Sequence, residues 1–340
     1  RCKSSCPKGR VLTEITSYIF VLLTMHFKPF WLGLLVCFML ACSTKPKDPI
    51  DGQKIEPILV QRFDEAFFAL DTNNLANGIT DLYKNYPEFS NDFFSRILQL
   101  DPQLDSLKVE SFYKQYLPFY IDSRSKNITK RIDDNLNKAL ARFHFYFPEY
   151  RMPNTLVYFI SPLNSFASVL GTNYIGVGLQ TINTQADASS KIPFYCVQNL
   201  VDDYLSKNQQ EKNLLYQMIE AGKRQYILNT ISLNTPDTLL WEYSSIQLKA
   251  VKEQESEIWQ YLKEQQMLMS NERIDFLNIL GDANNNSLLG APLPGNIGKF
   301  IGYKIVESYM QKQTTKPWND LRKLVATPAS EIYAGASYQP

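Results

Sequence analysis

Apolar residues recur every three or four positions over most of the chain from residue 58 onwards, which is the spacing of amphipathic α-helices. The first helix is predicted to begin near Ile58, with Leu59, Phe63, Phe67 and Leu70 on one face. The same spacing predicts further helices over residues 75–85, 89–100, 104–121, 125–146, 194–206, 210–231, 244–266, 271–280 and 296–313, with short ones near 317–325 and 328–333. We therefore expect a mostly helical protein.

Two segments in the middle of the chain have a different pattern. TLVYFIS at 155–161 and YIGVGLQ at 174–180 are rich in β-branched and aromatic residues and are bounded by Pro, Asn and Gly, as strands are. Gly171, Gly176 and Gly178 are expected to mark a turn and a close backbone approach. The predicted fold class is α+β, predominantly α-helical with a small central β-sheet.

An uncharged apolar run, FWLGLLVCFMLA, precedes the helical region at residues 30–41. Twelve residues span only about 18 Å as a helix, whereas a bilayer core of about 30 Å needs about 20 residues. The run has the length of a signal-peptide core, and Lys28 lies in the basic segment before it. We predict a signal peptide over residues 25–41 that starts at Met25. Residues 1–24 are interpreted as upstream sequence translated by mistake, the alternative being a genuine cytosolic extension.

The apolar run ends in the tetrapeptide MLAC at 39–42, which resembles a bacterial lipobox with Met39 in place of the usual Leu. In such signals the cysteine sulfur receives a diacylglycerol, the peptide is cleaved before the cysteine, and the new amino terminus is acylated. Several acyl chains hold a protein on a membrane far more firmly than one chain does. We predict lipidation of Cys42, a lipidated tether over 42–54 and a globular domain over 55–340. The alternative is a cleaved secretory signal that happens to end in Cys.

The charge distribution and the cysteine content restrict the partners and the covalent links that are expected for this protein. The chain has 35 Lys+Arg and 34 Asp+Glu, and both signs are scattered without a basic stripe, which excludes nucleic acid as the expected partner. After Cys42 the only cysteine is Cys196, so no intramolecular disulfide is available. Cys196 stands in the apolar stretch IPFYCVQNLV and is predicted to pack in the core. No cofactor is expected beyond the covalent lipid on Cys42.

Zinc hydrolysis is the first enzymatic chemistry to consider for a helix that follows a small sheet. A His-Glu-x-x-His motif needs two imidazoles one helical turn apart. The matching positions here are Val201-Asp-Asp-Tyr-Leu205, which contain no histidine. Beyond Cys42 the sequence has one histidine, His144, which is expected to be a packed or surface residue. We therefore predict no metal site, no catalytic residue and no enzyme activity.

Three carboxylates in the same region remain as candidates. Asp202 and Asp203 are neighbours on one helix and project about 100° apart, and Glu220 lies on the next helix. Buried and paired, they would make an acid/base site or a hard-cation site, so they are named as a degenerate site. The structural alternative is that they lie on solvated faces or form salt bridges with Lys223 or Arg224.

The segment PGNIGKFIGY opens the predicted helix over 296–313. Asn296 is expected to cap this helix through its side chain. Gly298 and Gly302 are four residues apart and form a ridge of small residues on one side. This ridge predicts that the helix packs closely against another element of the core.

Several short motifs, in their order and spacing, resemble the family of the gliding-motility-associated lipoprotein GldB. They are the lipobox Cys42, Val60-Gln-Arg-Phe63-Asp64, Tyr146-Phe-Pro148-Glu-Tyr150, Tyr174-Ile-Gly-Val-Gly178-Leu179, Met218-Ile-Glu-Ala-Gly222-Lys223, Trp259, and Pro294-Gly-Asn-Ile-Gly298-Lys-Phe-Ile-Gly302-Tyr303. The resemblance covers nearly all of 42–340. It implies a cell-envelope lipoprotein needed for gliding over surfaces, or a relative in a bacterium that does not glide, acting through protein–protein contacts with envelope partners.

The order of strand, helix and Glu-containing helix also resembles a zinc peptidase that lacks the metal-binding histidines, a distantly zincin-like arrangement. On this view Asp202, Asp203 and Glu220 mark where a metal site would be. Two alternatives to the interaction role follow: a divergent or degenerate metallopeptidase-like hydrolase, and an envelope ligand-binding lipoprotein. The expected location is the periplasmic face of the outer membrane. Ser43 follows the lipid cysteine, which is compatible with sorting to the outer membrane, and no acidic run follows it, which disfavours display on the cell surface.

Overall fold

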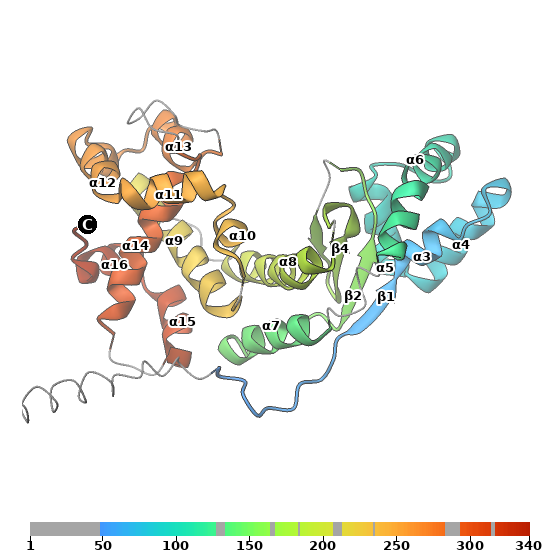
Figure 1. Ribbon diagram of the computed structural model, residues 1–340, viewed down its shortest axis with the longest axis horizontal. Coiled ribbons are helices and arrows are strands. Elements are labelled where there is room, and N and C mark those ends of the chain that lie inside the picture. Colours follow the sequence, from blue (N-terminus) through green and yellow to red (C-terminus); the bar gives the residue numbers. More distant parts are fainter. Residues whose placement is uncertain are drawn as a thin grey trace, which may run out of the picture. The chain divides into compact units, whose positions relative to one another are not determined.

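The computed structural model is mostly helical and has a four-stranded mixed sheet in the part that it describes, which confirms the predicted fold class (Figure 1). The described residues are 48–126, 133–163, 167–182, 184–206, 213–233, 235–282, 293–313 and 317–340. The predicted upstream segment, the signal peptide, Cys42 and the first residues of the tether lie outside them. Residues Gly52–Pro340 form one compact unit.

The sheet has the strand order β1-β2-β4-β3. Strand β1 (Leu59–Arg62) runs parallel to β2 (Thr155–Phe159), and β2 runs parallel to β4 (Tyr174–Gly178). Strand β3 (Ser168–Leu170) is antiparallel to β4 and forms the other edge. The two predicted strands are thus confirmed as β2 and β4, whereas β1 and β3 were not predicted.

The prediction of a helix from Ile58 is wrong over its first residues. Leu59 lies in β1, where it pairs with Thr155 of β2. Helix α3 begins only at Phe63 and ends at Phe68. Leu59 is 61% exposed, whereas Phe63 is fully buried, so the two residues do not share a buried face. The segment forms a strand because its backbone groups bond to β2, a partner far away in sequence that local periodicity does not report.

Aromatic side chains cover one face of the sheet. Helix α5 (Pro87–Asp92) and the turn η2 (Phe93–Ile97) supply most of them. The ring of Phe89 lies 5.3 Å from that of Phe159 in β2 and 4.7 Å from that of Phe63, measured between centroids. Rings at these separations and tilts stabilise a core beyond the area that they bury.

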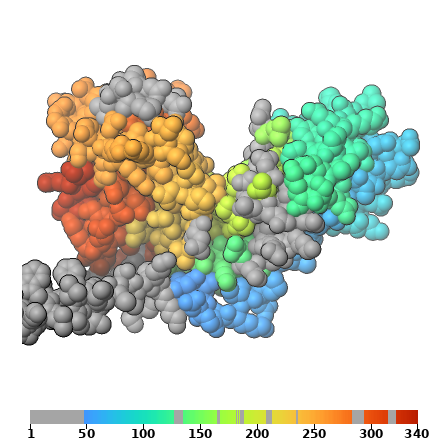
Figure 2. All heavy atoms as spheres, in the orientation of Figure 1, coloured from blue at the N-terminus to red at the C-terminus, as the bar shows by residue number. Residues whose placement is uncertain are grey.

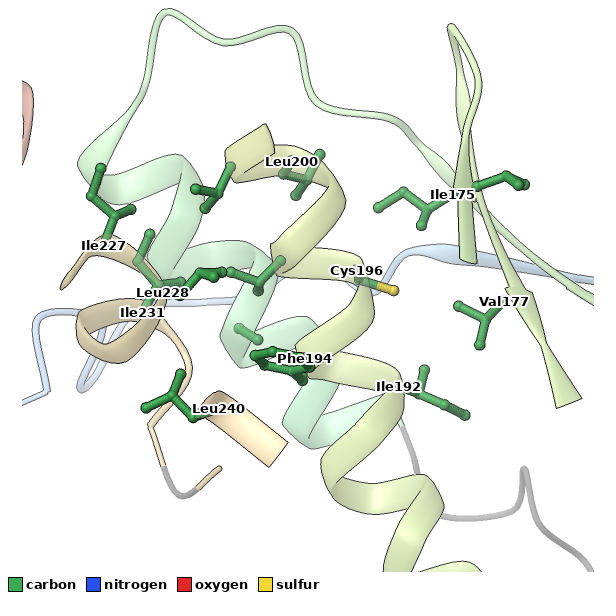
Figure 3. Packing of buried hydrophobic residues seen from close by; sticks show 14 of the residues in the cluster. Ile175, Val177, Ile192, Phe194, Cys196, Leu200, Ile227, Leu228, Ile231 and Leu240 are labelled. Carbon is green, nitrogen blue, oxygen red and sulfur yellow. The ribbon is translucent and has the colours of Figure 1, made fainter. Parts of the chain in front are cut away.

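The opposite face of the sheet packs on helix α8 (Gln185–Leu205). Figure 3 shows Cys196 of α8 with its sulfur towards Ile175 and Val177 of β4. Cys196 is fully buried, which confirms its predicted place in the core, and burial raises the pKa of its thiol. The start of this helix was predicted wrongly, since α8 begins before Pro193 and includes it. Packing on the sheet outweighs the backbone hydrogen bond that a proline removes.

Most of the remaining helices agree with the predicted segments, except at their ends and at one break. The short helices over 72–74, 179–181, 237–241 and 267–269 were not predicted, and the one over 179–181 takes up the end of the segment predicted as a strand over 174–180. The remaining helices are η1 (Thr72–Asn74), α4 (Leu75–Asn85), α6 (Ser106–Ser125), α7 (Asp133–Tyr146), η3 (Leu179–Thr181), α9 (Leu214–Ile231), α10 (Asp237–Trp241), α11 (Ser245–Glu253), α12 (Glu255–Glu264), η5 (Met267–Met269), α13 (Arg273–Leu280), α14 (Ile297–Gln311), α15 (Pro317–Ala326) and α16 (Ala329–Ala336). The predicted helix over 244–266 is interrupted at Gln254, between α11 and α12.

Helices α9 and α14 make the most extensive helix–helix contact of the described residues. A Cβ atom added to Gly302 would overlap the carbonyl of Met218, and one added to Gly222 would overlap the backbone of Gly302. The small-residue ridge therefore does allow close approach, as predicted. The predicted side-chain cap is wrong: Asn296 precedes α14 in a left-handed conformation (φ 54°) and makes no side-chain cap hydrogen bond.

Candidate functional site

The three candidate carboxylates lie on α8 and α9, and each has its own partner. Asp202 forms an ion pair with Arg224, whose Nη2 lies 2.9 Å from its Oδ2. Asp203 accepts a hydrogen bond of 2.7 Å from the hydroxyl of Tyr150. Glu220 accepts one of 2.6 Å from Nζ of Lys223. The two ion pairs expected under the structural alternative are therefore present.

The structure does not bring these carboxylates together as a set of ligands. Among the described residues there is no group of three or more His, Cys, Asp or Glu side chains that could hold a metal ion. His144 is exposed on α7. Lys223 is 2% exposed and also donates to the carbonyl of Thr327 at 2.7 Å, a bond that ties α9 to the segment before α16. Buried ammonium groups need such partners, which gives the pair a structural role.

Asp203 faces a feature that the sequence did not indicate, a polar cleft of about 1560 Å³. We call it the tyrosine cleft. Its walls come from α5 and η2, from the segment after α7, from β3 and the turn that follows, and from the end of α8. Its lining residues are Pro87, Glu88, Asn91, Asp92, Arg96, Glu149, Tyr150, Arg151, Ser168, Val169, Leu170, Gly171, Thr172, Asn199, Asp203 and Tyr204.

Two interlocked tyrosine–carboxylate pairs form one wall of the tyrosine cleft. Tyr150 donates to Asp203, and Tyr204 donates to Glu149 at 2.6 Å, so each segment supplies one phenol and one carboxylate. The ring of Tyr204 lies 4.3 Å from that of the fully buried Phe147, measured between centroids. The phenols are thus held in place by the core and by the opposite segment.

Hydrogen bonds to carboxylates also hold the turn between β3 and β4, on the other side of the tyrosine cleft. Glu88 accepts hydrogen bonds from the backbone N–H groups of Thr172 and Asn173, at 2.7 and 3.3 Å. Tyr174 donates to Asp92. These contacts hold the turn between β3 and β4 and the first residue of β4 on α5, so hydrogen bonds join separate elements in both walls of the cleft.

The phenols of the tyrosine cleft stay protonated well above neutral pH. Burial and the hydrogen bond to Glu149 raise the pKa of Tyr204 from 10.0 to about 12. The pKa of Tyr150 is likewise raised, mainly by burial and then by its hydrogen bond to Asp203. The pKa of Tyr174 is raised by burial and by its hydrogen bond to Asp92. Burial opposes ionisation of Glu149, but the hydrogen bond from Tyr204 prevails and lowers the pKa of Glu149.

These shifts predict a loss of stability at alkaline pH. An unfolded tyrosine ionises near pH 10.0 and Tyr204 in the folded protein near pH 12, so between these values the unfolded state binds fewer protons. The free energy of unfolding should therefore be fully retained below pH 10 and fall as the pH rises towards 12. Urea unfolding at several pH values measures it, and Tyr204→Phe should flatten the decline. An unchanged slope in this variant would contradict the assignment.

A family model described as gliding motility protein GldB matches residues 45–340. The chain belongs to the GldB family. It is therefore a gliding-motility-associated protein of the cell envelope. No curated protein and no solved structure matches the chain, so the zincin-like arrangement stays a prediction. In the described part of this GldB family member, none of the helices has both the length and the apolar character needed to cross a bilayer.

Proposed function

We propose that this GldB family member is a lipoprotein that is anchored through Cys42 and supports gliding motility, or its allied envelope machinery, through protein–protein contacts. The observation that carries the proposal is the family match over residues 45–340. The lipobox-like sequence MLAC at 39–42 lies immediately before the matched region and supports the lipid anchor. On this proposal the domain lies in the periplasm, at the inner face of the outer membrane.

The surface of α6 supports a role in protein contacts. Large apolar side chains are exposed on this helix and just before it: Leu107 is 79% exposed, Ile121 57% and Leu104 84%. Figure 2 shows the residues of α6, in green-blue, at the surface beside those of α4, in blue. Leu104 and Leu107 lie close together in sequence at the beginning of the helix and form a small exposed apolar pair of the kind that protein interaction sites use, whereas Ile121 lies near its other end.

The arrangement of the carboxylates favours this role over the alternative of a degenerate metallopeptidase-like hydrolase. A hydrolytic centre needs carboxylates that are available to a metal or to a water molecule. Asp202 and Glu220 are each engaged by a cation, Arg224 and Lys223. We therefore assign these two residues to the stability of the domain.

Complementation of a gene deletion tests the proposed function. Deletion in the native host should abolish colony spreading on agar, or the envelope function of the allied machinery in a host that does not glide, and the full chain should restore it. A double variant, Asp202→Asn with Glu220→Gln, keeps both side chains nearly isosteric and should restore it as well, because no hydrolysis is involved. Circular dichroism and membrane fractionation verify that this variant is folded and anchored.

Two outcomes would count against the proposal. If the deletion strain spreads normally and its envelope machinery is intact, the motility assignment is wrong. If the wild-type chain restores the function and the folded, anchored double variant does not, the hydrolase becomes the better explanation.

A further inference from the structure

The tyrosine cleft has the dimensions and the rigidity of a binding site for an extended ligand. Its volume of about 1560 Å³ exceeds the 300–1,000 Å³ that is typical of sites for drug-sized molecules. It is open and lined mainly by polar residues that come from helices, a strand and a turn. Since its walls are held by hydrogen bonds between these elements, a ligand would meet a preformed surface.

The wall formed by the two tyrosine–carboxylate pairs offers many hydrogen-bond acceptors. A carboxylate has about four acceptor positions, and Asp203 and Glu149 each use one for a phenol. The phenol oxygens of Tyr150 and Tyr204, having donated their protons, retain lone pairs as well. Such a wall is suited to ligand hydroxyl groups, which donate. Because these phenols ionise only at alkaline pH, the pattern does not change near neutrality.

Asn199 supplies the complementary donor, because its amide nitrogen has no hydrogen-bond partner in the part of the chain that the structure describes. Its side chain lines the tyrosine cleft, and its Nδ2 is buried without a hydrogen-bond partner there. A buried donor left unpaired costs about 1–3 kcal/mol. An unpaired group of this kind in a cavity wall is expected where a ligand completes the hydrogen bond.

Charge restricts the class of ligand. The lining residues include four carboxylates, those of Glu88, Asp92, Glu149 and Asp203, and two guanidinium groups, those of Arg96 and Arg151. The excess of negative charge disfavours phosphates, sulfated sugars and uronic acids. What remains is an uncharged ligand that is rich in hydroxyl groups and long enough for the cleft. The partly exposed rings of Tyr150 and Tyr204 add apolar surface for the C–H groups of such a ligand.

We propose that the tyrosine cleft binds an uncharged oligosaccharide, with Asp203, Glu149 and the phenols accepting from sugar hydroxyls and Asn199 donating to a ring or carbonyl oxygen. This function goes beyond the proposed role in motility and does not depend on the lipid anchor. A chain of N-acetylated amino sugars, as in cell wall, and a chain of neutral hexoses, as in exopolysaccharide, share the required chemistry.

Calorimetric titration of the full chain in detergent tests the proposal. The probes are an N-acetylglucosamine tetramer, a glucose tetramer and, as the anionic counterpart, a galacturonic acid tetramer. Binding of either uncharged tetramer at least about tenfold more tightly than the anionic one supports the proposal. The better of the two identifies the source as cell wall or exopolysaccharide. Absence of binding by both uncharged tetramers, or a preference for them over the anionic one of less than about tenfold, overturns it.

The variant Asn199→Leu separates recognition from folding. It replaces the unpaired amide by an apolar group of similar size, so the unfolding midpoint should stay equal or rise, while oligosaccharide affinity falls about tenfold. Ser232→Ala is the matched control, because Ser232 is a buried residue at the end of α9 whose Oγ also lacks a partner within the described residues, and it does not line the cleft. It should leave the affinity unchanged.

A second variant covers the case in which Asn199→Leu does not fold. Asp203→Asn can still accept from Tyr150 but loses half of its acceptor capacity towards a ligand, so affinity should again fall about tenfold. Asp122→Asn, on the exposed part of α6, is its control. Wild-type affinity in folded Asn199→Leu or Asp203→Asn would place the oligosaccharide elsewhere and refute the proposal.

Discussion

The variant Cys42→Ala is expected to leave the membrane fraction completely and to take up no palmitate analogue. The reason is that the sulfur of Cys42 is the proposed attachment point of the diacylglycerol, and acylation of the new amino terminus follows cleavage before this residue. Each buried methylene contributes about 0.8 kcal/mol to membrane binding, so the loss of several chains removes nearly all of it. No helix among the described residues is able to substitute as a membrane span.

The measurement compares wild type and variant, both expressed with the predicted signal peptide in a bacterium that has the lipoprotein pathway. Labelling with a palmitate analogue and fractionation of the envelope give the two readouts. Cys196→Ala is the matched control, since Cys196 is fully buried in α8 and should have no part in lipidation. If Cys42→Ala is still labelled and still sediments with membranes, the lipid assignment is wrong.

Gly302→Ala is expected to produce the largest loss of stability of any single methyl addition in the described helices. A Cβ atom at this position would overlap the carbonyl of Met218 in α9, and the obstacle is backbone that no side-chain rotation can move. Helices α9 and α14 would have to separate along their contact. Overpacking of a core costs about 1–3 kcal/mol, and a clash with helix backbone should cost about 3 kcal/mol or more.

Chemical denaturation of the full chain, followed by circular dichroism, measures this loss. Gly78→Ala in α4 is the matched control, because there a new methyl group meets only the end of the Leu70 side chain, which can rotate away. Alanine is favoured over glycine inside a helix by about 1 kcal/mol, so Gly78→Ala should be neutral or stabilising. Equal effects of the two substitutions would show that α9 and α14 do not approach as closely as described.

Local sequence patterns were sufficient where a helix or strand depends on its own residues. Helix α4 has the predicted bounds, and β2 and β4 lie within the two segments rich in β-branched and aromatic residues. The ridge of Gly298 and Gly302 also indicated a close helix contact correctly. In each case the spacing of apolar or small residues along one element carries the information, and this spacing is fully visible in the sequence.

Patterns failed where a distant segment supplies the stabilising contact. Leu59 fits a helical face, yet the segment forms β1 because β2 offers a parallel partner. The early start of α8, through Pro193, depends on the sheet that it covers. The tyrosine cleft was missed for the same reason. Its pairs join Tyr150 to Asp203 and Glu149 to Tyr204, and nothing in either sequence segment alone indicates the other.

The sequence by itself determined the mostly helical class with a small sheet, the core position of Cys196 and the resemblance to the GldB family, and it predicts the lipid anchor at Cys42. These properties follow from the order of residues along a short stretch or from the types of residue present. Only the tertiary structure decided how the carboxylates are used: Asp202 and Glu220 in ion pairs, and Asp203 in the wall of a cleft. A side chain's partners depend on which elements pack together, and packing is a property of the whole fold.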